Sequence, residues 1–286
     1  MEAVLSEIPD ANVELIPAEC DLANLESIKS FVSTTLKEEN SLDVVCYNAG
    51  IARNTAASEC LRTKEGFELT VGTNHFGHFY LNQLILPKIK QNTGRIVVTA
   101  SSVHDPDSPG GAQGSKATLG TLEGLKRDGN MFEMVDGEKF DADKAYKDSK
   151  LCNVLFTREL QRRLDKDGTG IKVNCFSPGL IVGTGLFRDQ NPIFTKVFDI
   201  AATNLLKVGE SVHWGGGTLE YMILDKTVAS KGGLFYTAAP GSGKYGDDAY
   251  GKQFAPAEVS KEARDDAKAR ELWELSDKLL GASSSA

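Results

Sequence analysis

Short runs of apolar residues alternate along the chain with longer stretches in which apolar positions recur every three or four residues. Runs such as Ile96-Val97-Val98 are continuously apolar, which is typical of strands that are covered on both faces of a sheet. The segments expected to form strands are Val13–Ala18, Asp43–Tyr47, Arg95–Ala100, Lys172–Phe176 and Leu234–Thr237.

The stretches with helical periodicity follow these runs in turn. They are Leu25–Glu38, Glu65–Gln91, Ala142–Asp165 and Gly209–Leu224. Strand and helix alternating in this order predict right-handed crossovers and a doubly wound parallel sheet of the α/β class. We expect one domain over residues 1–286.

A last helix is expected over Lys261–Leu280. Ser260 is a suitable N-cap for it, and Gly281 stands where it should end. Its apolar face is made by Leu272, Leu275 and Leu279. The tail after it, Gly281–Ala286, is expected to fray.

Composition narrows the function classes. The 286 residues are 41% hydrophobic and 25% charged, with a net charge of −8 and no basic stripe, so nucleic acid is not an expected partner. No apolar run approaches the roughly 18 residues of a membrane-spanning helix, and the first ten residues do not resemble a targeting segment. The five cysteines are dispersed, which indicates a reducing compartment. His75 and His78 lack a third ligand nearby, so no metal site is expected.

Tyr146 and Lys150 are the most informative pair. They lie four residues apart in a helical pattern, so both side chains can reach one cavity. A tyrosine ordinarily has a pKa near ~10. A cation held beside it favours the phenolate and should lower that pKa, which suits proton transfer in hydride chemistry. The alternative for the pair alone is a surface tyrosine beside a solvated lysine.

Small and polar residues mark the ends of three expected strands. Asn48-Ala49-Gly50 ends the strand Asp43–Tyr47, Ser101 follows the next strand, and Pro178-Gly179 with Thr184 follows a third. Asn74 lies inside the helix Glu65–Gln91. Parallel α/β sheets place ligands at these strand ends, so the set predicts one site there. Each residue taken singly could instead serve a turn or a loop.

A glycine-rich phosphate-binding turn is missing from the expected place. The chain has no glycine in its first 49 residues, and it begins with a helical remnant, Glu2–Glu7, before the strand Val13–Ala18. The Gly-Gly-Ala-Gln-Gly stretch at 110–114 has no strand leading into it and is expected to be a loop. We expect either an N-terminally truncated chain or one whose phosphate site is degenerate.

These residues in this order resemble the short-chain dehydrogenase/reductase family from about Val13 onward, which implies a Rossmann-like fold. The resemblance implies a catalytic tetrad. In it Ser101 orients the reacting group, Tyr146 supplies a proton, Lys150 lowers the tyrosine pKa and holds the nicotinamide ribose, and Asn74 anchors a water.

The same resemblance implies the cofactor site. Asp21 would lie beside the adenine, and Asn48, Ala49 and Gly50 would form the wall of the cofactor pocket. Pro178, Gly179 and Thr184 are assigned to that site together with Tyr146 and Lys150.

A narrower resemblance is to light-dependent protochlorophyllide oxidoreductases. It depends on the 44 residues between Ser101 and Tyr146, where ordinary family members have far fewer. The matching stretches are Lys116–Leu125, Met134–Asp141, Ala145–Asn153, Gly185–Arg188 and Ala269–Leu279. The sequence departs from that group at Leu180, where the group usually has cysteine.

This narrower resemblance implies NADPH as cofactor and protochlorophyllide, or another large apolar small molecule, as ligand. Hydride would go to one carbon of the C17–C18 double bond and the proton of Tyr146 to the other, as a step of chlorophyll biosynthesis in the chloroplast. Residues 186–206 would form a lid, or else pack on the core. The resemblance allows peripheral membrane contact, and association of copies through helices such as Glu65–Gln91 and Ala142–Asp165.

Two other functions fit the sequence. One is a different NADP-dependent reductase of the same family, acting on carbonyl or retinol-type substrates, which would be cytoplasmic. The other is a non-catalytic relative kept for pigment binding or for assembly with a partner, which the missing phosphate loop and Leu180 would favour.

Overall fold

A five-stranded sheet lies at the centre of the molecule. The computed structural model describes residues 14–39, 41–127, 131–182, 184–190, 200, 202, 209–238 and 254–284. The strands are β1 (Val44–Tyr47), β2 (Arg95–Thr99), β3 (Lys172–Phe176), β4 (Phe235–Thr237) and β5 (Ala255–Ala257), adjacent in that order. The first four run parallel, and β5 is antiparallel to β4.

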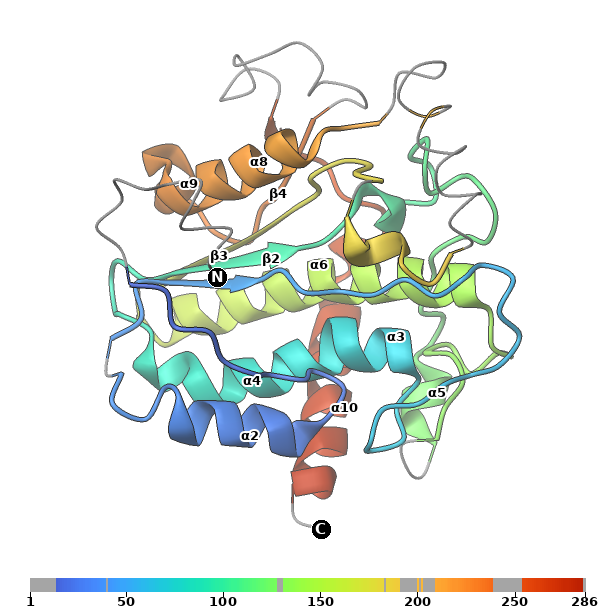
Figure 1. Cartoon of the computed structure of the whole chain (residues 1–286), viewed down its shortest axis with the longest axis horizontal. Helices are drawn as coiled ribbons and strands as arrows, with labels where there is room; N and C mark the ends of the chain where they lie inside the picture. Colours follow the sequence, from blue (N-terminus) through green and yellow to red (C-terminus); the bar gives the residue numbers. More distant parts are fainter. Residues whose placement is uncertain are drawn as a thin grey trace.

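Helices cover both faces of the sheet, as expected for a doubly wound arrangement (Figure 1). On one face lie α6 (Ala142–Lys166), which packs on β3, and α4 (His78–Ile85). A further helix, α2 (Leu25–Thr34), packs on α4. The other face carries α8 (Val212–Leu224) and α9 (Lys226–Ser230). The predicted α/β class is confirmed.

Four of the five predicted strands are confirmed to within one residue at each end. β2 and β3 lie in the middle of the sheet, and their side chains are mostly buried, which explains their continuous apolar sequence. β5 was not predicted because it is only three residues long and has Pro256 at its centre. Proline is tolerated in such a strand because it lies at the edge of the sheet.

The predicted first strand, Val13–Ala18, is wrong for the residues described. Residues 14–18 form no strand, and the adjacent side chains of Leu15 and Ile16 are both exposed. Among the described residues, β1 pairs only with β2. An apolar run without a neighbouring strand cannot satisfy its backbone groups in a sheet, and here it remains irregular. The predicted helical remnant Glu2–Glu7 lies outside the described residues.

The predicted helix Glu65–Gln91 consists of several shorter pieces. The side chain of Glu68 accepts hydrogen bonds from the backbone N–H groups of Thr70 and Val71, so helix begins at α3 (Leu69–Val71). A π-helical turn at Gly72–Gly77 then connects α3 to α4. After α4 the chain forms a 3-10 turn at Leu86–Lys88, where Pro87 cannot continue the hydrogen-bond ladder.

The other helix boundaries differ less. α2 ends at Thr34, four residues before the predicted end, and α6 extends one residue further than predicted. α8 begins at Val212 because the hydroxyl of Ser211 caps it, three residues after the predicted start.

The C-terminal helix, α10 (Asp266–Ser284), packs on α6. The predicted apolar face is confirmed, because Leu272 and Leu279 are buried in the core and Leu275 packs against it. The hydroxyl of Ser260 accepts a hydrogen bond from the N–H of Ala263, in a separate 3-10 turn at Glu262–Arg264, so Ser260 is not the N-cap of the long helix. α10 continues past Gly281 to Ser284, and the last two residues lie outside the described part.

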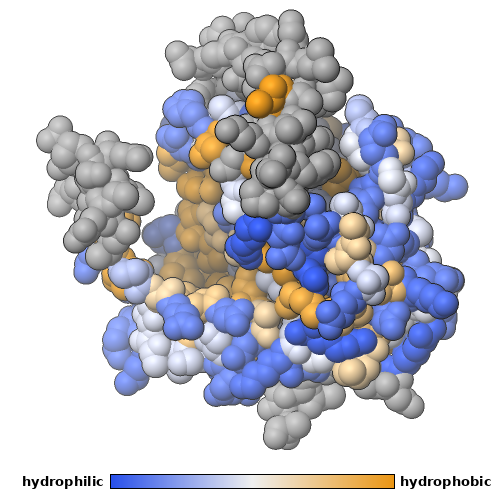
Figure 2. Space-filling view, turned by 45° about the vertical axis from the view of Figure 1, so that its right-hand side comes forward, coloured by the Kyte–Doolittle hydropathy of each residue, from blue (hydrophilic) through white to orange (hydrophobic). Residues whose placement is uncertain are grey.

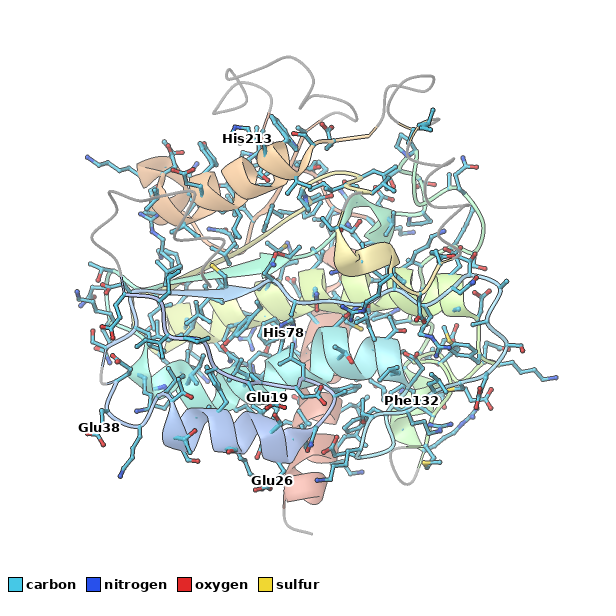
Figure 3. All side chains as sticks on the ribbon, in the orientation of Figure 1. Glu19, Glu26, Glu38, His78, Phe132 and His213 are labelled. Carbon is cyan, nitrogen blue, oxygen red and sulfur yellow. The ribbon has the colours of Figure 1, made fainter. Side chains whose placement is uncertain are left out.

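The long segment between Ser101 and Tyr146 is held to α6 by a buried ionic network. The ammonium of Lys144 pairs with Asp148 at 2.5 Å and with Asp136 at 2.7 Å, and it donates to the carbonyl of Thr118. The other carboxylate oxygen of Asp148 accepts from the N–H of Thr118. The segment includes α5 (Glu123–Lys126), which was not predicted, and Figure 3 shows Phe132 beside it. The insertion is therefore fixed to the helix that carries Tyr146.

In the part of the chain that the structure describes, no helix combines the length and the apolar character needed to cross a lipid bilayer.

Candidate active site

Tyr146 lies in the second turn of α6, which begins where the Asp141 side chain caps the N–H of Lys144. Ser101, which follows β2, has its side chain close enough to this phenol to lower the pKa of the hydroxyl. Burial raises the pKa of Tyr146 to about 12, and the nearby Ser101 side chain only partly opposes this effect. The phenol therefore carries its proton at neutral pH.

Lys150 lies one turn further along α6, on the same face. Its ammonium nitrogen is 5.6 Å from the centre of the Tyr146 ring and donates a 2.9 Å hydrogen bond to the carbonyl of Thr99. The side chain is buried, and burial lowers the pKa of Lys150 to about 8. The predicted proximity of the two side chains is confirmed.

The prediction that Lys150 lowers the pKa of Tyr146 is wrong for this structure. The ammonium donates to a strand carbonyl and lies over the tyrosine ring, and it is not among the causes that shift the pKa of Tyr146. The loss of water around the phenol therefore dominates its pKa. What the pair offers is a protonated acid next to a buried cation.

Asn74 lies in the π-helical turn, and its side-chain amide connects three elements. It accepts from the N–H of Ile51 at 2.8 Å, and it donates to the carbonyl of Ile51 at 2.9 Å and to the hydroxyl of Ser149 at 3.0 Å. The backbone carbonyl of Asn74 accepts a hydrogen bond from Nδ1 of His78. Burial lowers the pKa of His78 to about 4, so this ring is neutral, and Figure 3 shows it in the interior, between α4 and the sheet.

Asn48, Ala49 and Gly50 follow β1 at the same edge of the sheet. The hydroxyl of Thr99 donates to the side-chain oxygen of Asn48 at 2.9 Å. A side chain at Gly50 would place its Cβ 3.3 Å from Asn74 Oδ1 and 3.6 Å from the Lys150 ammonium. Gly50, Asn74 and Lys150 therefore meet at one point, and the absent side chain keeps that point open.

Pro178, Gly179 and Thr184 follow β3 and belong to a neighbouring group of contacts. The indole N–H of Trp214 donates to the carbonyl of Pro178, and Gly179 adopts a φ of 87° beside Glu210. Thr184 is exposed and donates to the carbonyl of Ile181. Among the contacts of the described residues, none joins these three directly to Tyr146 or Lys150.

Asp21 lies apart from this site, in the turn before α2. Its carboxylate is exposed and accepts a hydrogen bond from the N–H of Ala23. Cys46 and Asn48, at the outer edge of the sheet, are also exposed.

In Figure 2, which turns the right-hand side of Figure 1 forward, a hollow lined by apolar residues opens on the surface.

Three residues of this region were not predicted from the sequence. Thr99 holds Lys150 and Asn153 through its carbonyl and Asn48 through its hydroxyl. Ser149 joins Asn74 to the backbone of Tyr146. Thr99 could have been found because it stands at the end of a predicted strand, and Ser149 because it is next to Lys150 in the sequence. Arg53, which is described below, has no such signal in the sequence.

Residues 184–190 reach back to the segment that follows Gly50. Arg53 Nε donates to the carboxylate of Asp189 at 2.8 Å, and the side-chain amide of Gln190 donates to the carbonyl of Arg53 at 3.1 Å. The predicted lid, 186–206, is described only in part, because residues 191–199, 201 and 203–208 lie outside the described residues.

The donor set at the strand ends suits the nicotinamide–ribose part of a dinucleotide. It offers an ammonium, two hydroxyls and a wall without side chains at Gly50, which matches a flat ring next to a sugar diol. The described residues contain no group of three or more His, Cys, Asp or Glu side chains placed to hold a metal ion.

Comparison with known proteins gives one consistent family. A family model described as short chain dehydrogenase matches residues 1–119. A chloroplastic protochlorophyllide reductase of Daucus carota is 36% identical over 267 residues, which cover 91% of this chain but 64% of that protein. The protochlorophyllide reductase of Avena sativa is 36% identical over 268 residues, covering 91% of this chain and 82% of that one.

Solved structures agree on the fold. The L-sorbose reductase of Gluconobacter frateurii, solved with NADPH and L-sorbose, superposes with a TM-score of 0.55 at 18% identity, covering 85% of this chain and 82% of that one. The sequence matches and the arrangement of Ser101, Tyr146 and Lys150 indicate the same family. The chain belongs to the short-chain dehydrogenase/reductase family, and within that family it is similar to the protochlorophyllide reductases.

Proposed function

We propose that this chain is an NADPH-dependent oxidoreductase that reduces protochlorophyllide to chlorophyllide in a light-driven reaction. The observation that carries the proposal is the grouping of Ser101 and Lys150 around Tyr146, at the strand ends of an α/β sheet. The choice of protochlorophyllide as substrate follows the names of the relatives that are 36% identical to this chain. A chloroplast location is proposed because such relatives are named chloroplastic.

The cofactor would be held by Lys150 and by the wall at Asn48, Ala49 and Gly50, and when bound it would supply the hydride. Tyr146 would supply the matching proton, because its raised pKa keeps the hydroxyl protonated. Ser101 would orient the group that receives this proton. The two transfers together add two hydrogens across the C17–C18 double bond, so that one carbon takes the hydride and the other the proton.

Lys150 would keep the charge balance of the site. Its pKa of about 8 leaves the side chain mostly cationic at neutral pH, where it can bind the ribose hydroxyls and stabilise negative charge that develops on Tyr146 as the proton leaves. Asn74 would keep the cofactor wall in place through its two hydrogen bonds with Ile51.

The test is to mix the purified chain with NADPH and protochlorophyllide in the dark and then to illuminate it. We expect a red-shifted pigment band on mixing and conversion to chlorophyllide only after light. Tyr146→Phe should bind both molecules and convert pigment roughly 10²- to 10⁴-fold more slowly, because the placed acid is gone. Wild-type rates in that variant would contradict the role of Tyr146, and turnover in the dark would contradict light dependence.

A further inference from the structure

Arg53 is a mostly buried cation with unused hydrogen-bonding capacity. Its side chain is 13% exposed, and its Nε is paired with Asp189. Nη1 is buried and has no hydrogen-bond partner among the described residues. A guanidinium presents its donors as a planar fork that matches both oxygens of a carboxylate. One edge of this fork therefore remains available for a second acceptor.

The surroundings of Arg53 do not explain the unpartnered nitrogen. The positive charge of Arg53 helps to lower the pKa of the buried Glu68 carboxylate. That carboxylate, however, accepts hydrogen bonds from the backbone N–H groups of Thr70 and Val71. The carboxylate that does pair with Arg53, that of Asp189, is 51% exposed. An exposed carboxylate on a surface segment is held weakly and can exchange for another anion.

Arg53 is also close to the candidate active site. It follows Gly50 by three residues, which span at most about 11 Å of chain. The intervening Ile51 is fixed by both hydrogen bonds of the Asn74 amide. Gln190 binds the carbonyl of Arg53, so the chain that leaves Thr184 closes over the same segment. A short acidic side chain on the reacting ring of a substrate held at Tyr146 and Lys150 would therefore extend towards residues 51–53 and the guanidinium.

We propose that Arg53 binds a carboxylate group of the substrate, and that Asp189 occupies this place until the substrate enters. The inference rests on the proposed function, under which the group bound is the free propionate of protochlorophyllide. The substrate carboxylate would replace Asp189 on the guanidinium and would also reach Nη1. The exchange releases the 184–190 segment from Arg53, so substrate binding and the position of that segment are coupled.

The test measures dissociation constants in the dark, with NADPH present, for protochlorophyllide and for its methyl ester. The ester has the same ring system but no anion. Wild type should bind the free acid about tenfold to a hundredfold more tightly than the ester. Arg53→Gln should lose this preference by weakening only the acid. Asp189→Asn should bind the acid more tightly than wild type, because the competing carboxylate is gone.

A matched control is Arg264→Gln, which removes a surface arginine from its pair with Glu258 and should leave both constants unchanged. Thermal melting of each variant shows whether it is folded. If wild type binds acid and ester equally, or if folded Arg53→Gln keeps the preference, the carboxylate site is refuted while the proposed function stands. If wild type binds neither pigment, the proposed function fails and the inference fails with it.

Discussion

Lys150 should make the protein less stable at neutral pH than it would be without a charge at this position. Burial lowers the pKa of Lys150 from 10.5 to about 8. The unfolded chain therefore holds the proton more tightly than the folded one, and the free energy of unfolding must rise with pH between about 8 and 10.5. Replacing Lys150 by methionine, which keeps the length but not the charge, removes this effect.

The size of the effect follows from the two pKa values. A difference of about 2.5, at 1.36 kcal/mol for each pKa unit, gives a penalty of about 3 kcal/mol at pH 7. At pH 10 the lysine of the unfolded chain is also partly neutral, and the penalty falls below about 1 kcal/mol. Methionine loses the hydrogen bond to Thr99, which costs about 1 kcal/mol at every pH. We expect Lys150→Met to be about 2 kcal/mol more stable than wild type at pH 7 and to lose that advantage by pH 10.

The measurement is urea unfolding of wild type and Lys150→Met at pH 7, 8, 9 and 10, without cofactor. The informative quantity is the change with pH of the stability difference between the two proteins, because packing effects do not depend on pH. Leu151→Ala, a buried and uncharged change in the next residue, should give a pH-independent difference. A pH-independent difference for Lys150→Met as well would refute the assignment of Lys150 as a buried, destabilising cation.

Two further changes test the scaffold around the site. Asp148→Ala removes one of the two carboxylates that pair with the buried Lys144 ammonium, and it should lower the free energy of unfolding by roughly 3 kcal/mol, measured by urea titration. A loss below about 1 kcal/mol would show that this network does not hold the insertion to α6. Gly179→Ala would force a side chain onto φ 87° with its Cβ 2.6 Å from Glu210 Cγ, costing about 1–3 kcal/mol by the same assay. Gly216→Ala, in a helix with open space around it, should instead be neutral or stabilising.

Local patterns were sufficient to predict the sheet and the composition of the site. Four strands were located from short apolar runs, of which β2 and β3 are mostly buried, and Ser101 and Asn48 were found because they follow such runs. Asn74 was placed correctly on a helix, but its π turn depends on tertiary contacts with Ile51 and Ser149 that no local pattern reveals.

The rest could not be predicted because it depends on distant partners. The pKa of Tyr146 is set by burial, which a spacing of four residues does not determine. The pairing of Arg53 with Asp189 joins residues 136 positions apart. The apolar run at Val13–Ala18 has the composition of a strand, but residues 14–18 have no neighbour to pair with in the described structure.

The widened turn at Gly72–Gly77 also determines how the chain can change its length. Removing one residue there would replace the wider hydrogen-bonded turn by a regular α-helical one, and the residues that follow would keep nearly their present orientation. Phe79 would stay in the interior, and the amide of Asn82 would still face the Tyr47 hydroxyl. A single-residue deletion at this turn should therefore spare the rest of the helix and act mainly on Asn74, whose hydrogen bonds to Ile51 and Ser149 depend on the wider turn.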